Sequence, residues 1–329
     1  MKNNSFQEIY DKLKKCKKVL ISLHYGPDGD SLGACTAMKY FLERDFKCKV
    51  KLISYHNLAE NLSNFDFVKE IEFGKDISEE NFDEYDCVLF LDSGDASFFS
   101  GKLKEKFVIP LNAFTICIDH HNTNKGFAKM NYVDKIQPSA CSVILDMFRA
   151  LKIRFDKELA TRLLVGVCTD SGFFTYDTNP EKALKDAEFL IENEADYKII
   201  LENFLYAQPL RLKKYFGILY NNLKFDKSLK VGYSSISNSD IKKLGLNEAE
   251  VRLGPNELQM IAEFEFIFTL ADMGNYIKGS FRSKKGIDVS VFAKELGGGG
   301  HKAAASFILS NMKLEEAEKK VLDAIRKVG

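Results

Sequence analysis

The sequence carries no excess of charge of either sign, because 47 lysines and arginines are balanced by 47 aspartates and glutamates. A chain of this kind has no overall positive field with which to hold a long polyanion through counterion release. Among phosphate-bearing ligands, a short nucleotide or another small phosphate is therefore favoured over a long polyanion. No long nucleic acid is expected as a partner.

The seven cysteines lack paired spacings such as Cys-x-x-Cys, and their odd number excludes a complete disulfide framework. Long apolar runs are missing too, since no stretch approaches the ~20 residues needed to span a bilayer. The polar, lysine-rich start has no apolar segment of signal-peptide length. We therefore expect reduced thiols in a cytoplasmic protein that has no membrane partner. With 329 residues and no repeat at solenoid spacing, two globular domains are expected.

Histidine is scarce as well, with five in the chain, and four of the five lie in short motifs rich in aspartate and glycine. These motifs are His24-Tyr25-Gly26-Pro27-Asp28-Gly29-Asp30, Asp119-His120-His121 and Gly297-Gly298-Gly299-Gly300-His301. Lone aspartates, Asp92 and Asp170, end two further apolar runs. Imidazoles beside carboxylates suit a hard or borderline divalent metal. One carboxylate shared by two metals makes a clamp for both the attacking and the leaving oxygen at phosphorus. The residues therefore point to a two-metal phosphoesterase.

Short apolar runs in the N-terminal half indicate strands that are buried on both faces of a parallel sheet. Strands are expected over 19–24, 49–54, 87–92 and 114–119, with a helix over 31–44. The metal-type residues fall at the carboxyl ends of these strands, where open α/β sheets bind their ligands. Further helices are expected over 139–151, 157–168, 181–193 and 210–223.

The pattern of polar and apolar residues changes after residue 224. Residues 229–236 alternate like a strand, and 265–270 and 276–282 flank the hairpin turn signal Asp272-Met273-Gly274-Asn275. A helix over 288–296 then leads into the glycine run. The fold class is α/β, with a parallel-sheet N-terminal domain over 1–190, a helical linker over 191–223 and a smaller α+β domain over 224–329. We expect the active site in the cleft between the two domains.

Each motif alone also has a purely structural explanation. Pro27-Asp28-Gly29 is a common turn, and Asp92 and Asp170 suit helix N-caps. The glycine run suits a flexible loop, and Arg282 suits a solvated charge on an edge strand. The metal site is favoured because the motifs coincide. They are expected at the same level of the fold, and they contain most of the histidines in the chain.

Six ordered motifs make the chain resemble the DHH phosphoesterase family, in its smaller branch with the DHH-associated C-terminal domain. They are HYGPDGDSLG at 24–33, LDSGD at 91–95, DHHNTN at 119–124, GVCTDSGFF at 166–174, SFRSKKGIDVSVFA at 280–293 and GGGGHKAAA at 297–305. Within that branch the chain is most similar to the bacterial nanoRNase/pAp phosphatases. It departs from the pattern at Ala96-Ser97-Phe98-Phe99, where relatives often carry an arginine, which puts an auxiliary contact near the active site in doubt.

The resemblance implies two Mn²⁺ ions, with Mg²⁺ an open alternative. It puts one ion among His24, Asp28 and Asp92, and the other among Asp30, Asp92, His120 and Asp170. It assigns His121 to the scissile phosphate or the leaving group, and Asp119 to orienting the neighbouring imidazoles. Substrate binding is assigned to Arg282, Gly298, Gly299, Gly300 and His301, whose backbone N–H groups and side chains suit an anion.

The activity implied is hydrolysis of very short oligoribonucleotides to mononucleotides, with removal of the 3′-phosphate from adenosine 3′,5′-bisphosphate as a second activity. Alternatives are a cyclic or linear dinucleotide phosphodiesterase, a RecJ-like single-strand exonuclease and a manganese pyrophosphatase. A non-catalytic nucleotide sensor is the alternative from a different class. The sequence leaves open the preferred substrate, the cleavage polarity and whether the chain forms a homodimer.

Overall fold

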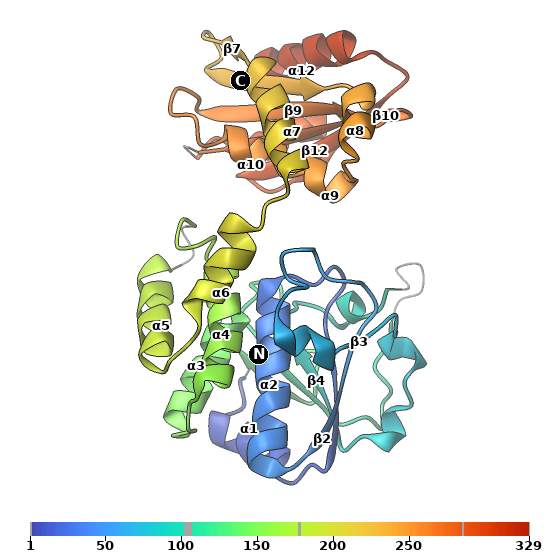
Figure 1. The fold of residues 1–329 in the computed structure, drawn as a ribbon. Helices are drawn as coiled ribbons and strands as arrows, with labels where there is room; N and C mark the ends of the chain where they lie inside the picture. Colours follow the sequence, from blue (N-terminus) through green and yellow to red (C-terminus); the bar gives the residue numbers. More distant parts are fainter. Residues whose placement is uncertain (1, 102–106, 177–178, 285, 329) are drawn as a thin grey trace. The chain divides into compact units, whose positions relative to one another are not determined.

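Two compact units make up the chain in the computed structural model, one from Met1 to Ala207 and the other from Gln208 to Gly329. The structure describes residues 2–101, 107–176, 179–284 and 286–328. We call the two parts the N-terminal unit and the C-terminal unit and describe each by itself (Figure 1). The domain limits 1–190, 191–223 and 224–329 stay a prediction.

A six-stranded parallel sheet forms the centre of the N-terminal unit. Its strand order is β3-β2-β1-β4-β5-β6, and every neighbouring pair is parallel. The strands are β1 (Lys18–Ser22), β2 (Lys49–Ser54), β3 (Glu72–Phe73), β4 (Cys87–Leu91), β5 (Thr115–Asp119) and β6 (Met130–Val133). The order reverses between β1 and β4, and ligands of open α/β sheets bind outside the strand ends at such a reversal. The predicted parallel sheet is confirmed.

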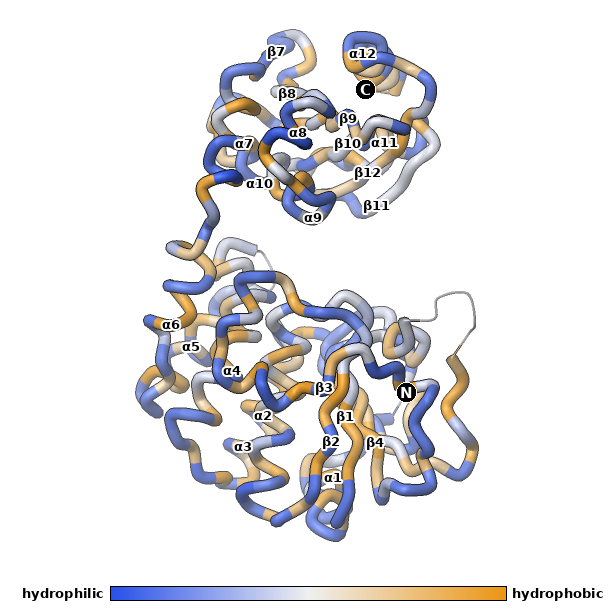
Figure 2. Tube along the Cα trace, turned by 45° about the vertical axis from the view of Figure 1, so that its right-hand side comes forward, coloured by the Kyte–Doolittle hydropathy of each residue, from blue (hydrophilic) through white to orange (hydrophobic). Residues whose placement is uncertain are grey.

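Both faces of this sheet are buried, as its continuous apolar strands predict. Val19 and Ile21 of β1 belong to the larger core, whereas Leu20, between them, belongs to a second core. Figure 2 shows hydrophobic residues along β1 and β4. The larger core is completed by α1 (Phe6–Leu13), α2 (Gly29–Phe46), η1 (Asp66–Glu70), α3 (Ala140–Ala150), α4 (Lys157–Asp170), α5 (Pro180–Glu192) and α6 (Tyr197–Leu201). The second core is completed by short turns, η2 (Ile77–Glu79), η3 (Phe82–Glu84) and η4 (Ala96–Phe99).

The helices expected in the N-terminal unit are present, with ends that differ from the prediction by a few residues. One difference matters for function, because α4 extends to Asp170 instead of ending at Cys168. Asp170 is therefore neither a helix N-cap nor a loop residue. A short π-helix, η5 (Glu202–Tyr206), closes the unit.

A mixed six-stranded sheet, in the order β11-β12-β10-β9-β8-β7, forms the C-terminal unit. Its strands are β7 (Lys224–Asp226), β8 (Val231–Ile236), β9 (Phe266–Asp272), β10 (Tyr276–Ser283), β11 (Gly299–Gly300) and β12 (Ala304–Ser310). The pair β8 and β9 is parallel, and the other pairs are antiparallel. The hairpin predicted around Gly274 is confirmed as β9 and β10.

Helices cover both faces of the second sheet. One core includes residues of α11 (Val289–Glu295) and α12 (Leu314–Val328). The other includes residues of α7 (Leu210–Asn221), α8 (Asn238–Leu244), α9 (Glu248–Val251) and α10 (Gly254–Leu258). Since Leu212, Tyr215 and Leu219 of α7 lie in this second core, α7 packs as a part of the C-terminal unit.

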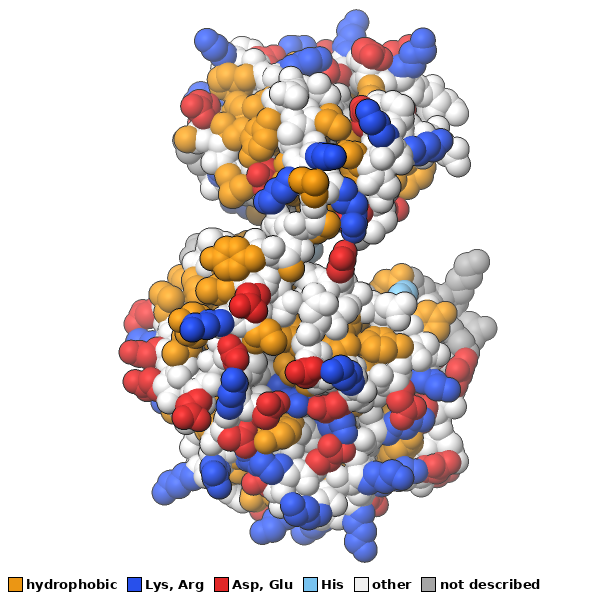
Figure 3. Space-filling view, in the orientation of Figure 1, with side chains coloured by type: hydrophobic (Ala, Val, Ile, Leu, Met, Phe, Trp, Pro, Cys, Tyr) orange, Lys and Arg blue, Asp and Glu red, His pale blue; other side chains and the backbone are white. Residues whose placement is uncertain are grey.

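The seven cysteines are all buried free thiols, in agreement with the expected reduced state. Within the described ranges, no helix combines the length and the apolar character needed to cross a membrane. On the face that Figure 3 presents, acidic and basic side chains of the N-terminal unit are intermingled instead of forming a field of one sign. This agrees with the balanced charge of the sequence.

Candidate active site

The metal-type residues of the N-terminal unit meet at the carboxyl ends of its central strands. His24 follows β1, Asp92 follows β4, and His120 follows β5 directly. Asp30 comes from the first turn of α2, and Asp170 from the last turn of α4. Segments more than a hundred residues apart in the chain thus converge beside the reversal point of the sheet.

Asp92 lies between two imidazoles. Its Oδ2 is 3.3 Å from Nε2 of His24, and its Oδ1 is 3.5 Å from Nε2 of His120. The residue is buried, and its φ of 60° lies in the left-handed region, where a non-glycine residue is strained by about 1–3 kcal/mol. The strained backbone turns one carboxylate so that its two oxygens face different partners.

Three sets of side chains that could hold an ion share this neighbourhood, and one of them joins Asp92, Asp119, His120 and His121. His24, Asp28 and Asp92 bring ligand atoms within 4.8 Å of one another, and so do Asp30, His120 and Asp170. Nε2 of His120 is 3.3 Å from Asp170 Oδ2 and 3.9 Å from Asp30 Oδ2. All six residues that the sequence suggested as metal ligands therefore lie in one place.

Backbone carbonyls orient the two imidazoles. Nδ1 of His24 is 3.0 Å from the carbonyl oxygen of Tyr25, and Nδ1 of His120 is 3.2 Å from that of Gln137. If each Nδ1–H donates to its carbonyl, the lone pair at Nε2 faces the carboxylates, which is how metal-binding histidines are usually held. Nothing in the sequence pointed to Gln137, because its contribution is a backbone atom.

The N-terminus of α3 holds the carboxylate of Asp30, which is 1% exposed. The N–H groups of Ala140 and Cys141 donate to Oδ2 and Oδ1 of Asp30, at 2.6 and 3.0 Å. A helix N-terminus stabilises an anion through such N–H groups and its dipole. Gly166 of α4 makes room, since a Cβ there would lie 2.4 Å from Oδ1 of Asp30.

The electrostatics indicate a shortage of positive charge. Burial raises the pKa of Asp30 well above its usual range, and Asp92 and Asp170 raise it further. Burial likewise raises the pKa of Asp170, to about 6. Carboxylates this crowded are stabilised by a cation between them.

The raised pKa values of two imidazoles indicate the same shortage of positive charge. Burial opposes the protonated form of His24, but the adjacent carboxylates of Asp28 and Asp92 outweigh burial and raise the pKa of His24 to about 11. For His120, burial is outweighed by Asp92, Asp30 and Asp170, and its pKa rises to about 10. The donor set of carboxylates and imidazoles therefore fits hard or borderline divalent cations.

Asp119 faces the second histidine of its motif. Its Oδ1 is 2.7 Å from Nδ1 of His121, and its Oδ2 accepts a hydrogen bond of 2.7 Å from Nδ2 of Asn124. Burial raises the pKa of Asp119, but these two partners outweigh it, so that its pKa is lowered. The bond to Asp119 raises the pKa of His121. His121 is thus oriented by a buried carboxylate and stays accessible to solvent.

A basic pocket of about 230 Å³ lies in the C-terminal unit. Its lining includes Arg282, Gly299 and Gly300, which the sequence suggested, and Arg252 and Lys278, which it did not. The charges of Arg252 and Lys278 are shared with Glu248, whose carboxylate contacts both. Nε of Arg282 donates to Oδ1 of Asn256 at 2.8 Å. Three cations around one pocket suit a phosphate group.

The second half of the glycine run, Gly299 and Gly300, is a short strand that pairs with β12. The N–H of Gly298 donates to the carbonyl of Ala293 at 2.8 Å, and the N–H of Gly297 to that of Lys294 at 3.0 Å. These two N–H groups are used within the fold, so four glycine N–H groups cannot converge on one anion. His301 is exposed, and its N–H donates to the carbonyl of Ala304.

Two family models match the chain. Residues 18–167 match the DHH family, N-terminal domain, and residues 229–328 match the DHHA1 domain. The first match contains the histidines and most of the carboxylates of the metal-type cluster. The second match contains Arg282 and the glycine run.

One relative is similar over its full length. The bifunctional oligoribonuclease and PAP phosphatase NrnA of Mycoplasma genitalium is 28% identical over 335 residues, which cover 100% of this chain and 99% of the relative. Two solved structures share the fold. An exopolyphosphatase-related protein from Bacteroides fragilis is 21% identical, with a TM-score of 0.84 and coverage of 98% and 95%. RecJ from Thermus thermophilus, in complex with Mn²⁺, is 12% identical, with a TM-score of 0.54 and coverage of 98% of this chain and 54% of RecJ.

Proposed function

The chain belongs to the DHH family of phosphoesterases, and from that premise we propose that it hydrolyses very short oligoribonucleotides to mononucleotides. Removal of the 3′-phosphate of adenosine 3′,5′-bisphosphate is proposed as its second activity. Similarity over the full length to a bifunctional oligoribonuclease and PAP phosphatase supports both activities. The observation that carries the chemistry is Asp92, whose two oxygens face two different imidazoles.

We propose two divalent ions, Mn²⁺ in preference to Mg²⁺, as the cofactors. One would be held by His24, Asp28 and Asp92, and the other by Asp30, Asp92, His120 and Asp170. The distances among these ligand atoms support this assignment. When bound, such a pair lowers the pKa of a water molecule and neutralises charge at the scissile phosphate.

His121 supplies the proton in the proposed reaction. Its Nδ1 is bound to Asp119, so its second ring nitrogen is available to protonate the departing oxygen or to donate to the phosphate. Asp119 keeps the ring in one orientation and stabilises its charged form. Proton transfer by a side chain positioned in this way contributes typically ~10²- to 10⁴-fold to the rate.

The basic pocket of the C-terminal unit would bind a second phosphate of the substrate. Arg282 offers a planar fork suited to phosphate, with Arg252 and Lys278 beside it. Adenosine 3′,5′-bisphosphate and a 5′-phosphorylated dinucleotide both carry a terminal phosphate for this pocket. Gly299, Gly300 and His301 are proposed to assist, and for Gly298 only its small size is proposed to matter.

A panel of substrates tests the proposal. Purified protein with Mn²⁺ would be given a 5′-phosphorylated dinucleotide, a 20-nucleotide RNA, adenosine 3′,5′-bisphosphate, a cyclic dinucleotide and pyrophosphate. We expect the highest kcat/KM for the dinucleotide and turnover of the bisphosphate. A higher kcat/KM for pyrophosphate, or for the long RNA, would overturn the assignment, and binding without turnover of any of them would indicate a sensor.

A further inference from the structure

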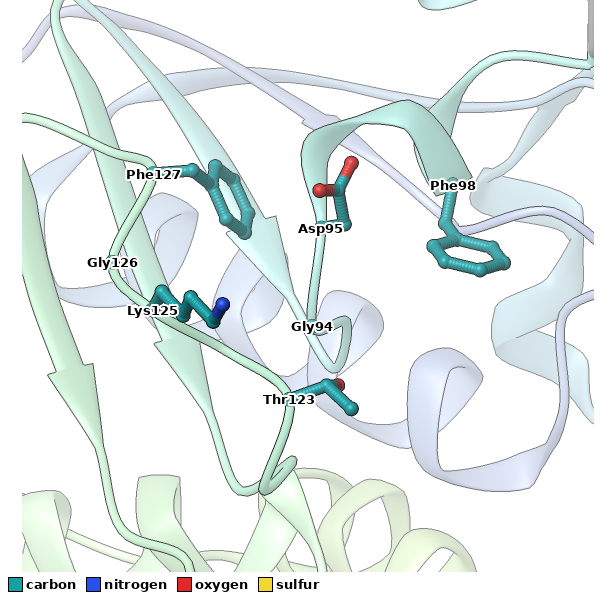
Figure 4. Close-up of a pocket in the computed structure, with 7 residues that line it drawn as sticks. All are labelled: Gly94, Asp95, Phe98, Thr123, Lys125, Gly126 and Phe127. Carbon is teal, nitrogen blue, oxygen red and sulfur yellow. The ribbon is translucent and has the colours of Figure 1, made fainter. Parts of the chain in front are cut away.

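A pocket of about 550 Å³ lies in the N-terminal unit between two loops that continue from the candidate active site. One loop follows β4 and supplies Gly94, Asp95 and Phe98, and the other follows β5 and supplies Thr123, Lys125, Gly126 and Phe127 (Figure 4). Gly94 comes two residues after Asp92, and Thr123 two residues after His121. The pocket is therefore a direct neighbour of the site, built by the same loops.

The floor of the pocket is firmly held. The two loops approach so closely that a Cβ at Gly94 would lie 2.2 Å from Oγ1 of Thr123. Nδ2 of the buried Asn124 donates to the carbonyl of Ser93 at 3.1 Å and to Asp119 at 2.7 Å. The carboxylate that orients His121 is thus linked by hydrogen bonds to both loops of the pocket.

Two aromatic side chains flank the pocket from opposite loops (Figure 4). Phe98 is 52% exposed, although its neighbour Phe99 is buried in the core. The carbonyl of Phe98 accepts a hydrogen bond from the N–H of Tyr25, the residue after His24. Phe127 packs edge-on against Phe90 of β4, with 5.5 Å between the ring centroids. The ring of Phe127 and the backbone of Phe98 are therefore held in place before any ligand binds.

Among the described residues that line the pocket, Lys125 is the cation and Asp95 is the carboxylate. The side chain of Lys125 extends into the space between the two loops (Figure 4), and among the described residues no carboxylate forms an ion pair with it. An aromatic surface with a nearby lysine, next to a phosphate-cleaving site, is the combination that binds single-stranded nucleic acid by stacking. The volume lies within the range of roughly 300–1,000 Å³ typical of small-molecule sites.

The two proposed substrates differ in what they would place here. Loss of the 3′-phosphate from adenosine 3′,5′-bisphosphate breaks the bond between phosphorus and O3′. Water adds to phosphorus, and O3′ departs with a proton. The same bond broken in a 5′-phosphorylated dinucleotide releases the first nucleotide, and the second nucleoside keeps the scissile phosphate. The bisphosphate has no second nucleoside, and its two phosphates would occupy the metal site and the basic pocket.

We propose that the Phe98–Phe127 pocket binds the second nucleoside of an RNA substrate, with its base against the aromatic rings. Lys125 then binds the phosphate that follows in a trinucleotide. The inference rests on the proposed function and deepens it, because it assigns to one pocket the difference between the oligoribonuclease and the bisphosphate phosphatase activities. Stacking does not require a particular base, so all four bases are accepted.

The test compares substrates within one variant. Phe98→Ala should lower the ratio of kcat/KM for the dinucleotide to kcat/KM for the bisphosphate by about tenfold or more. Phe98→Tyr, which keeps an aromatic ring, should retain the ratio. On a dinucleotide whose second unit is abasic, wild type and Phe98→Ala should be equal. Lys125→Ala should lower kcat/KM for a trinucleotide more than for the dinucleotide, whereas Lys129→Ala, a lysine of the same segment outside the pocket, should change neither.

Equal losses on the dinucleotide and the bisphosphate, or an undiminished effect of Phe98→Ala on the abasic substrate, would overturn the proposal. Failure of the proposed function is a separate result, in which wild type cleaves none of these substrates. In that case, a binding measurement tests whether the pocket holds a nucleotide. Adenosine 5′-monophosphate would be titrated by calorimetry into Arg282→Ala protein, in which the basic pocket is weakened. Loss of binding on adding Phe98→Ala supports the pocket, and unchanged binding overturns it.

Discussion

Nδ1 of His121 lies 2.7 Å from Oδ1 of Asp119, a carboxylate with no exposed surface. The contact commits one ring nitrogen of His121 to the protein, while 43% of the side chain stays exposed. Asn124 holds the other oxygen of the same carboxylate. We therefore expect Asp119 to act on the reaction through His121, so that its removal does not resemble the loss of a metal ligand.

Asp119→Asn keeps the shape of the carboxylate and removes its charge. We expect kcat on the dinucleotide to fall about 10- to 100-fold, because proton transfer by a positioned side chain contributes about 10²- to 10⁴-fold and Asp119 supports that step only through His121. KM and the affinity for Mn²⁺ should stay within about twofold. Steady-state kinetics and calorimetry measure these quantities. Because the pair acts as a unit, adding Asp119→Asn to a His121→Gln protein should lower kcat only a little further. A change confined to KM would argue against the orienting role.

Asp92 is the carboxylate on which the two-metal proposal depends. Asp92→Ala should reduce the number of Mn²⁺ ions bound from two to one or none, and it should lower kcat by about 10³-fold or more, since metal pairs supply several kcal/mol of transition-state stabilisation. Calorimetry gives the stoichiometry, and Asp11→Ala, an exposed aspartate of α1, is the control. Two ions bound with wild-type affinity to the Asp92→Ala protein would be incompatible with a shared ligand.

Arg282 should act on binding and not on the chemical step. Hydrogen bonds to charged groups contribute about 1.5–3 kcal/mol, so Arg282→Ala should raise KM for the 5′-phosphorylated dinucleotide about 10- to 150-fold with kcat nearly unchanged. The same dinucleotide without its 5′-phosphate serves as the control substrate. Its KM should respond much less to Arg282→Ala, and an equal response would mean that Arg282 does not bind the terminal phosphate.

The sequence predicted the metal-type cluster well, because the fold concentrates polar residues in one place. Continuous apolar strands such as Cys87–Leu91 identify a parallel sheet, and the carboxyl ends of parallel strands share one edge. His24, Asp92 and His120 could therefore be placed together without a structure. Asp170 was harder to place, since its position depends on how far α4 continues.

Contacts made by backbone atoms or between distant segments were not predictable in this way. The carbonyl of Gln137 and the N–H groups of Ala140 and Cys141 leave no signature in residue type. Arg252, which directly follows α9, and Lys278 of β10 line the basic pocket, and either residue taken alone resembles a surface charge. The glycine run suggested an anion-binding loop. However, Gly299 and Gly300 pair with β12, and the N–H groups of Gly297 and Gly298 donate to carbonyls of α11.

Substitutions at two helical glycines distinguish the proposed role of Asp30 in metal binding from a general effect on stability. A methyl group at Gly166 would lie 2.4 Å from Oδ1 of Asp30 and 2.3 Å from Sγ of Cys141, whereas one at Gly217 of α7 would meet no atom within 4 Å. Gly217→Ala should stabilise the C-terminal unit by about 0.5–1 kcal/mol through helix propensity. Gly166→Ala should instead destabilise the N-terminal unit by about 1–3 kcal/mol through overpacking.

The displacement of Asp30 should also appear in metal binding. Because ligands that bind only the folded state raise its stability, saturating Mn²⁺ should raise the Tm of the wild type and of Gly217→Ala equally, and that of Gly166→Ala by less. Thermal unfolding with and without Mn²⁺ measures the difference. If Gly166→Ala were destabilised but gained as much from Mn²⁺ as the wild type, the close packing at Gly166 would serve the helix interface alone, and Asp30 would have to be removed from the ligand set.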